Sequence, residues 1–233
     1  MANAAILETR PTIERRTLGD AVYVHLRELL MSGRVGPGER LSLRTLAGAL
    51  GVSMMPVREA VTRLVADGAL EVAPQRAVRV PIMNVVQFRE LAAIRVEIEG
   101  FAAELAARAG TSDSIETIAV AEEAFRAEAV KRRPDLLRAV ALNKDFHFAV
   151  YEAAGLPALV EIIGGLWLKV GPVINLDLRE NPDRFANGGA VRFHAETAMA
   201  IRRRDGAAAR AGIAADISGT AAFLLAKGGF AKA

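Results

Sequence analysis

Residues 42–64 read SLRTLAGALGVSMMPVREAVTRL, and this stretch decides the fold of the first third of the chain. Ser42 precedes a short segment with apolar residues at helical spacing, and Gly51 ends it. Ser53 precedes a second such segment, with Pro56 in its first turn, where a missing N–H costs nothing. The pattern predicts a helix-turn-helix, which can place its second helix in a DNA major groove.

A further helix is expected before this motif, and a β-ribbon after it. Residues 17–20 read TLGD, a capping signal that starts the first helix. Gly68 ends the third helix, and the runs 70–72 and 78–80 are short and β-like, with a basic tip between them. The sequence therefore predicts three helices and a two-stranded ribbon that ends at Pro81.

The rest of the chain has a helical pattern almost to its end. Glycine and proline interrupt the apolar periodicity and divide it into segments of helix length. The expected helices cover residues 84–109, 113–131, 135–154, 156–175, 189–204 and 206–227. We thus expect a mainly α protein with a flexible arm over residues 1–16, a winged helix-turn-helix over 17–81 and an antiparallel all-α bundle over 82–233.

The composition excludes several kinds of site. The 233 residues include no cysteine, which excludes disulfides, thiolate zinc sites and cysteine nucleophiles. Residues 1–81 hold 11 arginines, no lysine and 8 acidic residues, so their net charge of +3 equals that of the whole chain. A basic first third indicates an anionic partner such as nucleic acid, although so small an excess also fits an ordinary protein surface.

We expect neither a membrane segment nor a secretion signal. The longest apolar stretch, residues 158–176, is interrupted by Glu161 and Lys169. Residues 1–16 contain an early acidic residue and no apolar core of signal-peptide length. The expected location is therefore the cytoplasm.

Polar residues of the first unit are placed to contact DNA. Arg44 lies at the start of the second helix and Arg58 points outward from the third, where phosphates or base edges are in reach. Gln75 and Arg76 at the ribbon tip can enter a minor groove, whose negative potential suits arginine. A helix-turn-helix alone is weak evidence, because many helical hairpins never touch DNA.

Four short motifs follow one another in this region: Val22-Tyr23 with Leu26-Arg27, Pro37-Gly38 with Leu41, Leu50-Gly51-Val52-Ser53, and Pro56-Val57-Arg58-Glu59-Ala60. In order and spacing they resemble the winged-helix domain of GntR-type bacterial transcription regulators, over residues 17–81. The resemblance implies a homodimer on a palindromic operator of double-stranded DNA, with recognition helices in major grooves and wing tips in the minor groove. It also implies DNA contacts from Arg44, Arg58, Gln75 and Arg76.

Two positions depart from the family pattern. Met54-Met55 follow Ser53 where the family has Arg-Thr, and Ala77 stands where the wing has glycine. The lost arginine changes the expected operator sequence but leaves the phosphate-binding surface, which carries most of the affinity. We include Ser53, Met54 and Met55 among the DNA contacts. The methionines either meet a thymine methyl group or pack against a neighbouring part of the protein.

Histidines indicate a metal site in the bundle. His25 is expected at the surface, whereas Asn143 and His147 lie four residues apart and so share a helix face. His194 and Asp216 lie on the last two helices, and antiparallel packing can bring all four side chains together. Such a set suits Zn²⁺, Mn²⁺ or Ni²⁺. The alternative is two buried histidines, each hydrogen-bonded to a neighbour, with Asp216 on the surface.

The second unit also carries motifs: Ala93-x-Arg95-x-x-x-Glu99, Asn143-x-x-Phe146-His147, His194, Arg204-Asp205 and Asp216. They resemble the FCD effector domain of the FadR-like branch of the same family, over residues 84–227. The resemblance implies metal ligands at Asn143, His147, His194 and Asp216. The family usually has histidine in place of Asp216 and often has aspartate in place of Asn143. It further implies a small organic acid whose carboxylate pairs with Arg95. Alternatively, Arg95 pairs with Glu99 along its own helix.

One hypothesis and two alternatives follow. The protein is expected to be a homodimeric, ligand-responsive transcription regulator, a repressor, that senses a small organic acid through its effector-binding and dimerisation domain, residues 82–233. One alternative is a metal-dependent enzyme of small organic acids, although no general base or nucleophile stands out. The other is a DNA-binding architectural dimer with a vestigial pocket. Phe146 and Trp167 are expected to pack in the core.

Overall fold

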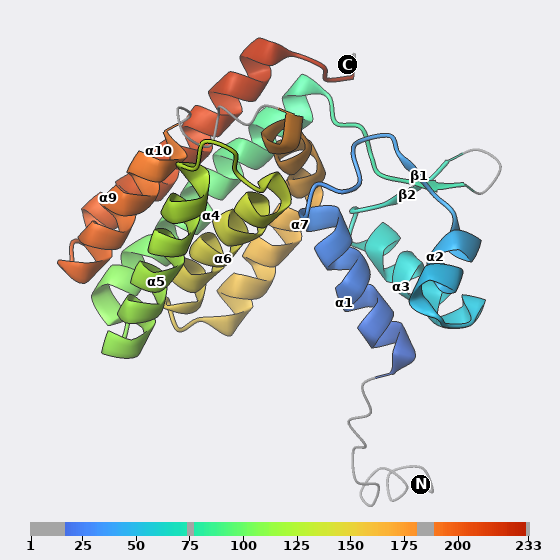
Figure 1. The fold of residues 1–233 in the computed structure, drawn as a ribbon, viewed down its shortest axis with the longest axis horizontal. Helices are drawn as coiled ribbons and strands as arrows, with labels where there is room; N and C mark the ends of the chain where they lie inside the picture. The colour runs from blue at the N-terminus through green and yellow to red at the C-terminus, as the bar shows by residue number, and fades with distance from the viewer. Residues whose placement is uncertain (1–16, 74–76, 181–188, 232–233) are drawn as a thin grey trace, which may run out of the picture.

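The computed structural model describes residues 17–73, 77–180 and 189–231. It opens with a winged-helix unit, built from α1 to β3, and continues with a helical unit, built from α4 to α10 (Figure 1). The predicted fold class, a mainly α chain with a winged helix-turn-helix before a helical bundle, is confirmed. The expected arm, residues 1–16, lies outside the described residues, and so does the ribbon tip, residues 74–76.

The helices of the winged-helix unit begin and end close to the capping residues and glycines that the sequence analysis identified. Thr17 and Asp20 form a reciprocal capping box at the first helix, and Gly51 closes the second helix with a left-handed φ of 65°. The unit contains α1 (Leu18–Met31), β1 (Arg40–Leu41), α2 (Leu43–Leu50), α3 (Met54–Ala66), β2 (Glu71–Val72) and β3 (Val78–Arg79). Their inward side chains, among them Leu26, Leu30 and Leu64, are buried in a common core.

The sheet differs from the sequence-based expectation. The predicted ribbon is present as the antiparallel pair β2 and β3, but β1 pairs with the other side of β3, giving the order β1-β3-β2. The expected two-stranded ribbon is therefore a three-stranded sheet. The added strand has only two residues, Arg40 and Leu41, so it carries no alternation that a sequence pattern could reveal. Pairing with β3 creates it.

The helical unit contains six helices in the part of the chain that the structure describes. Each packs mainly against helices next to it in sequence, and several of them also pack against α4. They are α4 (Val85–Ala109), α5 (Ser112–Ala129), α6 (Leu136–Glu152), α7 (Pro157–Glu180), α9 (Ala190–Arg202) and α10 (Gly206–Lys227). The end predicted for α7, residue 175, is wrong, because the helix continues to Glu180. Tertiary contacts support the extension: Leu178 is buried, and Asp177 forms an ion pair with Lys227 of α10 at 2.9 Å.

The two units meet where α1 lies against α7, beside each other in Figure 1. Glycine allows the close approach: a Cβ at Gly171 would lie 3.3 Å from the Cα of Met31. The Asn175 side chain donates a hydrogen bond to the Met31 carbonyl, at the end of α1. Lys144 of α6 also pairs with Glu28 of α1, at 2.5 Å. A single cluster of buried apolar residues runs through both units. The contact between α1 and α7, called the joint below, is therefore part of the core.

Two helices of the bundle are long and apolar enough to cross a membrane by length and composition, over Pro157–Leu178 and Gly206–Lys227. In this structure both are walls of the helical unit. Each buries polar groups among its apolar ones, namely Asn175 and Asp177 on α7 and Asp216 on α10. A core helix of a bundle passes the same length and composition test.

We predict that Gly33→Ala destabilises the protein more than Gly51→Ala. Both glycines have positive φ, +67° and +65°, so each substitution carries a backbone cost of about 1–2 kcal/mol. A Cβ at Gly33 would also lie 2.6 Å from the backbone carbon of Asn175, whereas one at Gly51 meets nothing within 4 Å. Overpacking of this kind adds about 1–3 kcal/mol. Urea unfolding of the two variants measures the difference, and equal losses would contradict a tight joint.

Candidate functional site

One candidate surface is the outer face of α2 and α3. Arg44, Ser53, Met55 and Arg58 are all exposed there, and Met55 is 71% exposed. Neither Arg44 nor Arg58 pairs with an acidic residue among those that the structure describes. Ser53 occupies the N-cap position of α3, but its side chain makes no capping hydrogen bond. The start of α3 therefore presents a cation, a hydroxyl and an apolar side chain to an outside partner.

Other residues near this face have internal partners. Met54 is half-buried and packs against the core of the unit, which matches the packing alternative for this methionine. Arg63 forms an ion pair with Asp20 at 2.6 Å and lies over the Tyr23 ring, 4.0 Å from its centroid. The predicted contacts Gln75 and Arg76 lie outside the described residues.

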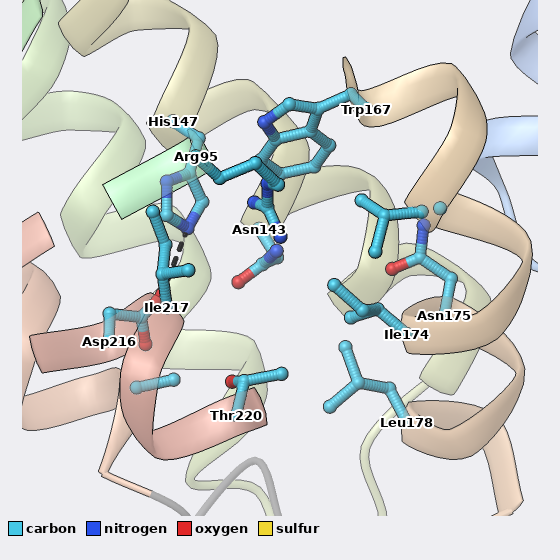
Figure 2. A pocket seen from close by; sticks show the side chains of 13 residues that line it. Arg95, Asn143, His147, Trp167, Ile174, Asn175, Leu178, Asp216, Ile217 and Thr220 are labelled. Carbon is cyan, nitrogen blue, oxygen red and sulfur yellow. Dashed lines mark ion pairs between the residues drawn. The ribbon is translucent and has the colours of Figure 1, made fainter. Parts of the chain in front are cut away.

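A second candidate site lies inside the helical unit, where three helices each contribute one side chain of a type that can bind a metal. His147 of α6, His194 of α9 and Asp216 of α10 offer ligand atoms that all lie within 4.8 Å of one another. The Asp216 Oδ2 is 3.3 Å from the His147 Nε2 and 3.8 Å from the His194 Nε2. Figure 2 shows the ion pair between His147 and Asp216 at the edge of a cavity. Asp216 is buried, so the alternative that put it on the surface is wrong.

The charges of this cluster favour a cation. Burial raises the pKa of the Asp216 carboxyl, but the His147 and His194 rings outweigh it and hold that pKa well below its usual range. Burial lowers the pKa of His194 in spite of the nearby carboxylate, which favours the neutral imidazole. Neither ring nitrogen of His194 has a hydrogen-bond partner among the described residues. A buried carboxylate next to an unpartnered imidazole is a donor set that suits a borderline divalent metal.

The cavity beside the cluster is small. It measures about 30 Å³, whereas a single water molecule needs about 10–15 Å³. Asn143 and Arg95 both line it, together with His147 and Asp216 of the cluster. The other lining residues are Trp167, Val170, Gly171, Ile174, Asn175, Leu178, Ala190, Ile217 and Thr220. All four residues that the sequence predicts as metal ligands are thus within or next to one site: three cluster and Asn143 lines its cavity.

Arg95 is tied to a neighbour and also faces the cavity. Its Nε and Nη2 donate to the two carboxylate oxygens of Glu99 at 2.6 and 3.2 Å. Within the described residues no hydrogen bond involves its Nη1, so one edge of the guanidinium is available to a ligand. The intrahelical pair is present as the sequence-based alternative proposed, and the cavity position leaves the effector contact possible in addition.

Glu99 is the acceptor of a buried network that sequence reasoning missed. Besides Arg95, it accepts hydrogen bonds from the Tyr151 hydroxyl and from the Trp167 indole at 3.2 Å. Tyr151 in turn contacts the His147 Nδ1 at 2.9 Å. One signal was present in the sequence, because Tyr151 follows His147 by four residues and so shares its helix face. Trp167 was expected in the core, and it is buried but also donates to this network.

Asn175 is a second residue that sequence reasoning missed. It lines the cavity from α7, and its side chain donates to the Met31 carbonyl at the end of α1. The two facts place one side chain in contact with both the candidate pocket and the winged-helix unit. The only sequence signal was a polar residue inside an apolar helix.

Comparison with known proteins decides the family. Residues 18–80 match the model of the bacterial regulatory proteins of the gntR family, and residues 90–219 match the FCD domain. The chain belongs to the GntR family. It is a DNA-binding transcription regulator with an FCD domain, and the predicted family is confirmed.

The relatives of this regulator agree. The Escherichia coli HTH-type transcriptional regulator McbR is 35% identical over 147 residues, which are 63% of this chain and 66% of that protein. The solved structure of E. coli McbR/YncC has a TM-score of 0.83 at 30% identity, covering 91% of this chain and 99% of that one. A putative transcriptional regulator GntR from Rhodococcus, at 22% identity, shares the fold with a TM-score of 0.72 over 89% of this chain and 97% of its own. The sequence alignments span between 36% and 66% of the first curated relatives.

The family also settles one alternative. Members of the GntR family, and the relatives found here, are transcription regulators rather than enzymes. The alternative of a metal-dependent enzyme is therefore wrong. The cluster of His147, His194 and Asp216 needs an explanation within a regulator.

We predict that Arg44→Ala combined with Arg58→Ala weakens binding to duplex DNA. Because each arginine that contacts a phosphate contributes about one unit to the slope of log affinity against log salt concentration, the slope should fall by up to about two. Fluorescence anisotropy over a range of salt concentrations measures it. Arg132→Ala combined with Arg133→Ala removes the same charge from an exposed turn of the helical unit and should leave the slope unchanged. An equal loss in both pairs would remove α2 and α3 as the DNA-binding face.

Proposed function

We propose that this regulator is a metal-dependent sensor whose DNA binding responds to a small organic acid. The observation that supports it most directly is the position of one cavity. Its lining includes His147 and Asp216, whose ligand atoms cluster with those of His194, and another of its walls, α7, packs on α1 of the winged-helix unit. A ligand in this cavity contacts the residues that join the pocket to the DNA-binding part of the chain.

The donor set fits a divalent ion. FCD domains often bind metals, and this cluster offers one carboxylate oxygen and two imidazole nitrogens, with the Asn143 side chain nearby. An ion there would neutralise the charge of Asp216 and would be coordinated by His194, whose ring nitrogens have no hydrogen-bond partner among the described residues. Zn²⁺, Mn²⁺ or Ni²⁺ suit such mixed nitrogen and oxygen ligands. When bound, the ion would supply a Lewis-acidic anchor for a carboxylate.

The effector we propose is a small carboxylate. Arg95 can offer it the Nη1 edge that Glu99 leaves open, and Asn143 can donate or accept beside it. A cavity of about 30 Å³ has room for more than one water molecule, since one needs about 10–15 Å³, but it is small for an acid of several carbon atoms. Binding therefore requires the walls to move, and the helix that can transmit such a movement is α7.

We propose that α7 carries the signal through Asn175. A ligand that displaces the cavity wall alters the hydrogen bond from Asn175 to the Met31 carbonyl, and this bond helps to hold α1 in place. The effector can shift DNA binding only by its different affinity for the two positions of the winged-helix unit. The close glycine contacts at Gly33 and Gly171 make this joint rigid, which favours two discrete arrangements over a gradual one.

On DNA, we propose a homodimer that binds a palindromic operator in the cytoplasm and represses transcription by covering the promoter. Arg44, Ser53, Met55 and Arg58 are the proposed contacts among the described residues, while Met54 packs against the core. Gln75 and Arg76, which lie outside the described residues, remain proposed contacts as well. Two recognition helices related by a two-fold axis would read half-sites about one helical turn apart. A footprint on the DNA upstream of its own gene tests the symmetry, and a reporter gene tests the sign of regulation.

We predict that His147→Ala combined with His194→Ala abolishes metal retention. After loading with Zn²⁺ and gel filtration, mass spectrometry should find a stoichiometric amount of zinc in the wild type and a trace in the variant. His25→Ala is the matched control, because His25 is exposed on α1. Zn²⁺ at about 100 times its Kd should also raise the free energy of unfolding by about 2.7 kcal/mol. Asp216→Asn keeps the shape of the side chain and removes its charge, so an undiminished zinc affinity in this variant would contradict the role of Asp216 as the anionic ligand even if the histidine variant is unstable.

We also predict that Asn175→Ala uncouples the pocket from DNA binding. In the wild type, Zn²⁺ added to the chelator-treated protein should change DNA affinity by a factor within the range of about 5 to 150 that couplings usually span. In Asn175→Ala the ratio of DNA affinities with and without zinc should approach one, while zinc still binds. Glu28→Gln is the control, because it removes an ion pair of the same joint without touching the cavity. An unchanged ratio would show that the signal takes another route, and a ratio of one in the wild type would favour the architectural dimer with a vestigial pocket.

A further inference from the structure

We propose that Tyr151 and Glu99 are positioning residues for the metal site: they fix His147 in the tautomer that carries its proton on Nδ1 and presents its Nε2 lone pair to the metal. The inference deepens the proposed function, since it assigns a role around the same site to residues that do not touch the ion.

The direction of each hydrogen bond follows from what the groups can do. Arginine and the tryptophan indole can only donate, so Glu99 is the acceptor for Arg95 and Trp167. The Tyr151 hydroxyl also donates to the Glu99 Oε2, and this uses its single proton. The hydroxyl oxygen then has only lone pairs left for the His147 Nδ1, which lies 2.9 Å away. The Nδ1 must therefore be the donor.

The same tautomer exposes an unshared pair on the other side of the ring. With the proton on Nδ1, the Nε2 is the ring atom left to bind a metal, and it lies 3.3 Å from the Asp216 Oδ2. These two atoms face each other in a buried place, so a positive charge must lie between them, either a second ring proton or a metal ion. The chain of hydrogen bonds from Glu99 through Tyr151 to His147, called the relay below, therefore directs the Nε2 rather than the Nδ1 toward the metal.

The relay is rigid enough to impose this choice. The side chain of Glu99 is fully buried and that of Arg95 is 5% exposed. Tyr151 and His147 are fixed four residues apart on α6, while Glu99 lies on α4. Since four donors hold the Glu99 carboxylate, it cannot turn away from Tyr151 without breaking several bonds at once. Ligating histidines commonly have such a partner on their second nitrogen, and its removal typically weakens metal affinity about 10- to 100-fold.

The variant Tyr151→Phe tests the relay by deleting one hydroxyl and keeping the ring. The two tyrosines of the chain allow a matched control, because Tyr23→Phe deletes the hydroxyl that bonds Asp67 in the winged-helix unit. Zinc affinity is measured by competition with a chromogenic chelator, and the tautomer of His147 in the metal-free protein by ¹⁵N NMR of the imidazole ring. Thermal unfolding of both variants checks that they fold.

We expect wild type and Tyr23→Phe to show the Nδ1–H tautomer and the same zinc affinity. Tyr151→Phe should show loss of the single tautomer and zinc binding weakened about 10- to 100-fold. An Nδ1–H signal unchanged in Tyr151→Phe, or zinc affinity equal to that of the control, would overturn the relay. The NMR measurement needs no metal, so it judges the relay even if the wild type binds no zinc, a result that would count against the proposed metal sensor alone.

Discussion

The contact of α1 with α7 is the constraint on which the rest of this molecule depends. At Gly171 the two helices approach so closely that a side chain would press on the Met31 backbone, and the Asn175 amide uses the last carbonyl of α1 as its acceptor. The apolar core therefore continues from one unit into the other. A winged helix on a flexible linker could bind DNA, but it could not report what happens inside the bundle, because nothing would connect the two.

Two buried carboxylates of the helical unit, Glu99 and Asp216, have different surroundings. The difference indicates which of them stabilises the fold and which belongs to the candidate site. Glu99 accepts from Arg95, Tyr151 and Trp167, so its charge is neutralised and its lone pairs are used. Asp216 faces two imidazole rings at 3.3 and 3.8 Å, and no arginine or lysine pairs with it among the described residues. A buried anion with all its donors supplied stabilises a fold, whereas one that shares its oxygen with two imidazole rings and has no arginine or lysine partner suits a cation.

Much of the fold could be predicted from the sequence because local signals agree with the tertiary structure. The capping box at Thr17, the left-handed Gly51 and the apolar spacing of α3 each act over a few residues, and each is seen in the structure. Where prediction failed, the cause was a distant contact. Neither β1 nor the last turn of α7 has a pattern of its own, since a pairing with β3 and an ion pair to α10 support them.

In the candidate site, too, local sequence signals predicted some features and contacts between distant residues decided the others. The sequence by itself determined which residue types are available: a helix with Asn143 and His147 on one face, a histidine and an aspartate on later helices, and Arg95 next to its own partner Glu99. Spacing along a helix says nothing about distance between helices, so packing alone brought His147, His194 and Asp216 together within 4.8 Å. Packing also turned Tyr151 toward Glu99 and Asn175 toward α1. These choices belong to the tertiary structure because they depend on how close two helices lie and how each is rotated, and both are set by the sum of all core contacts.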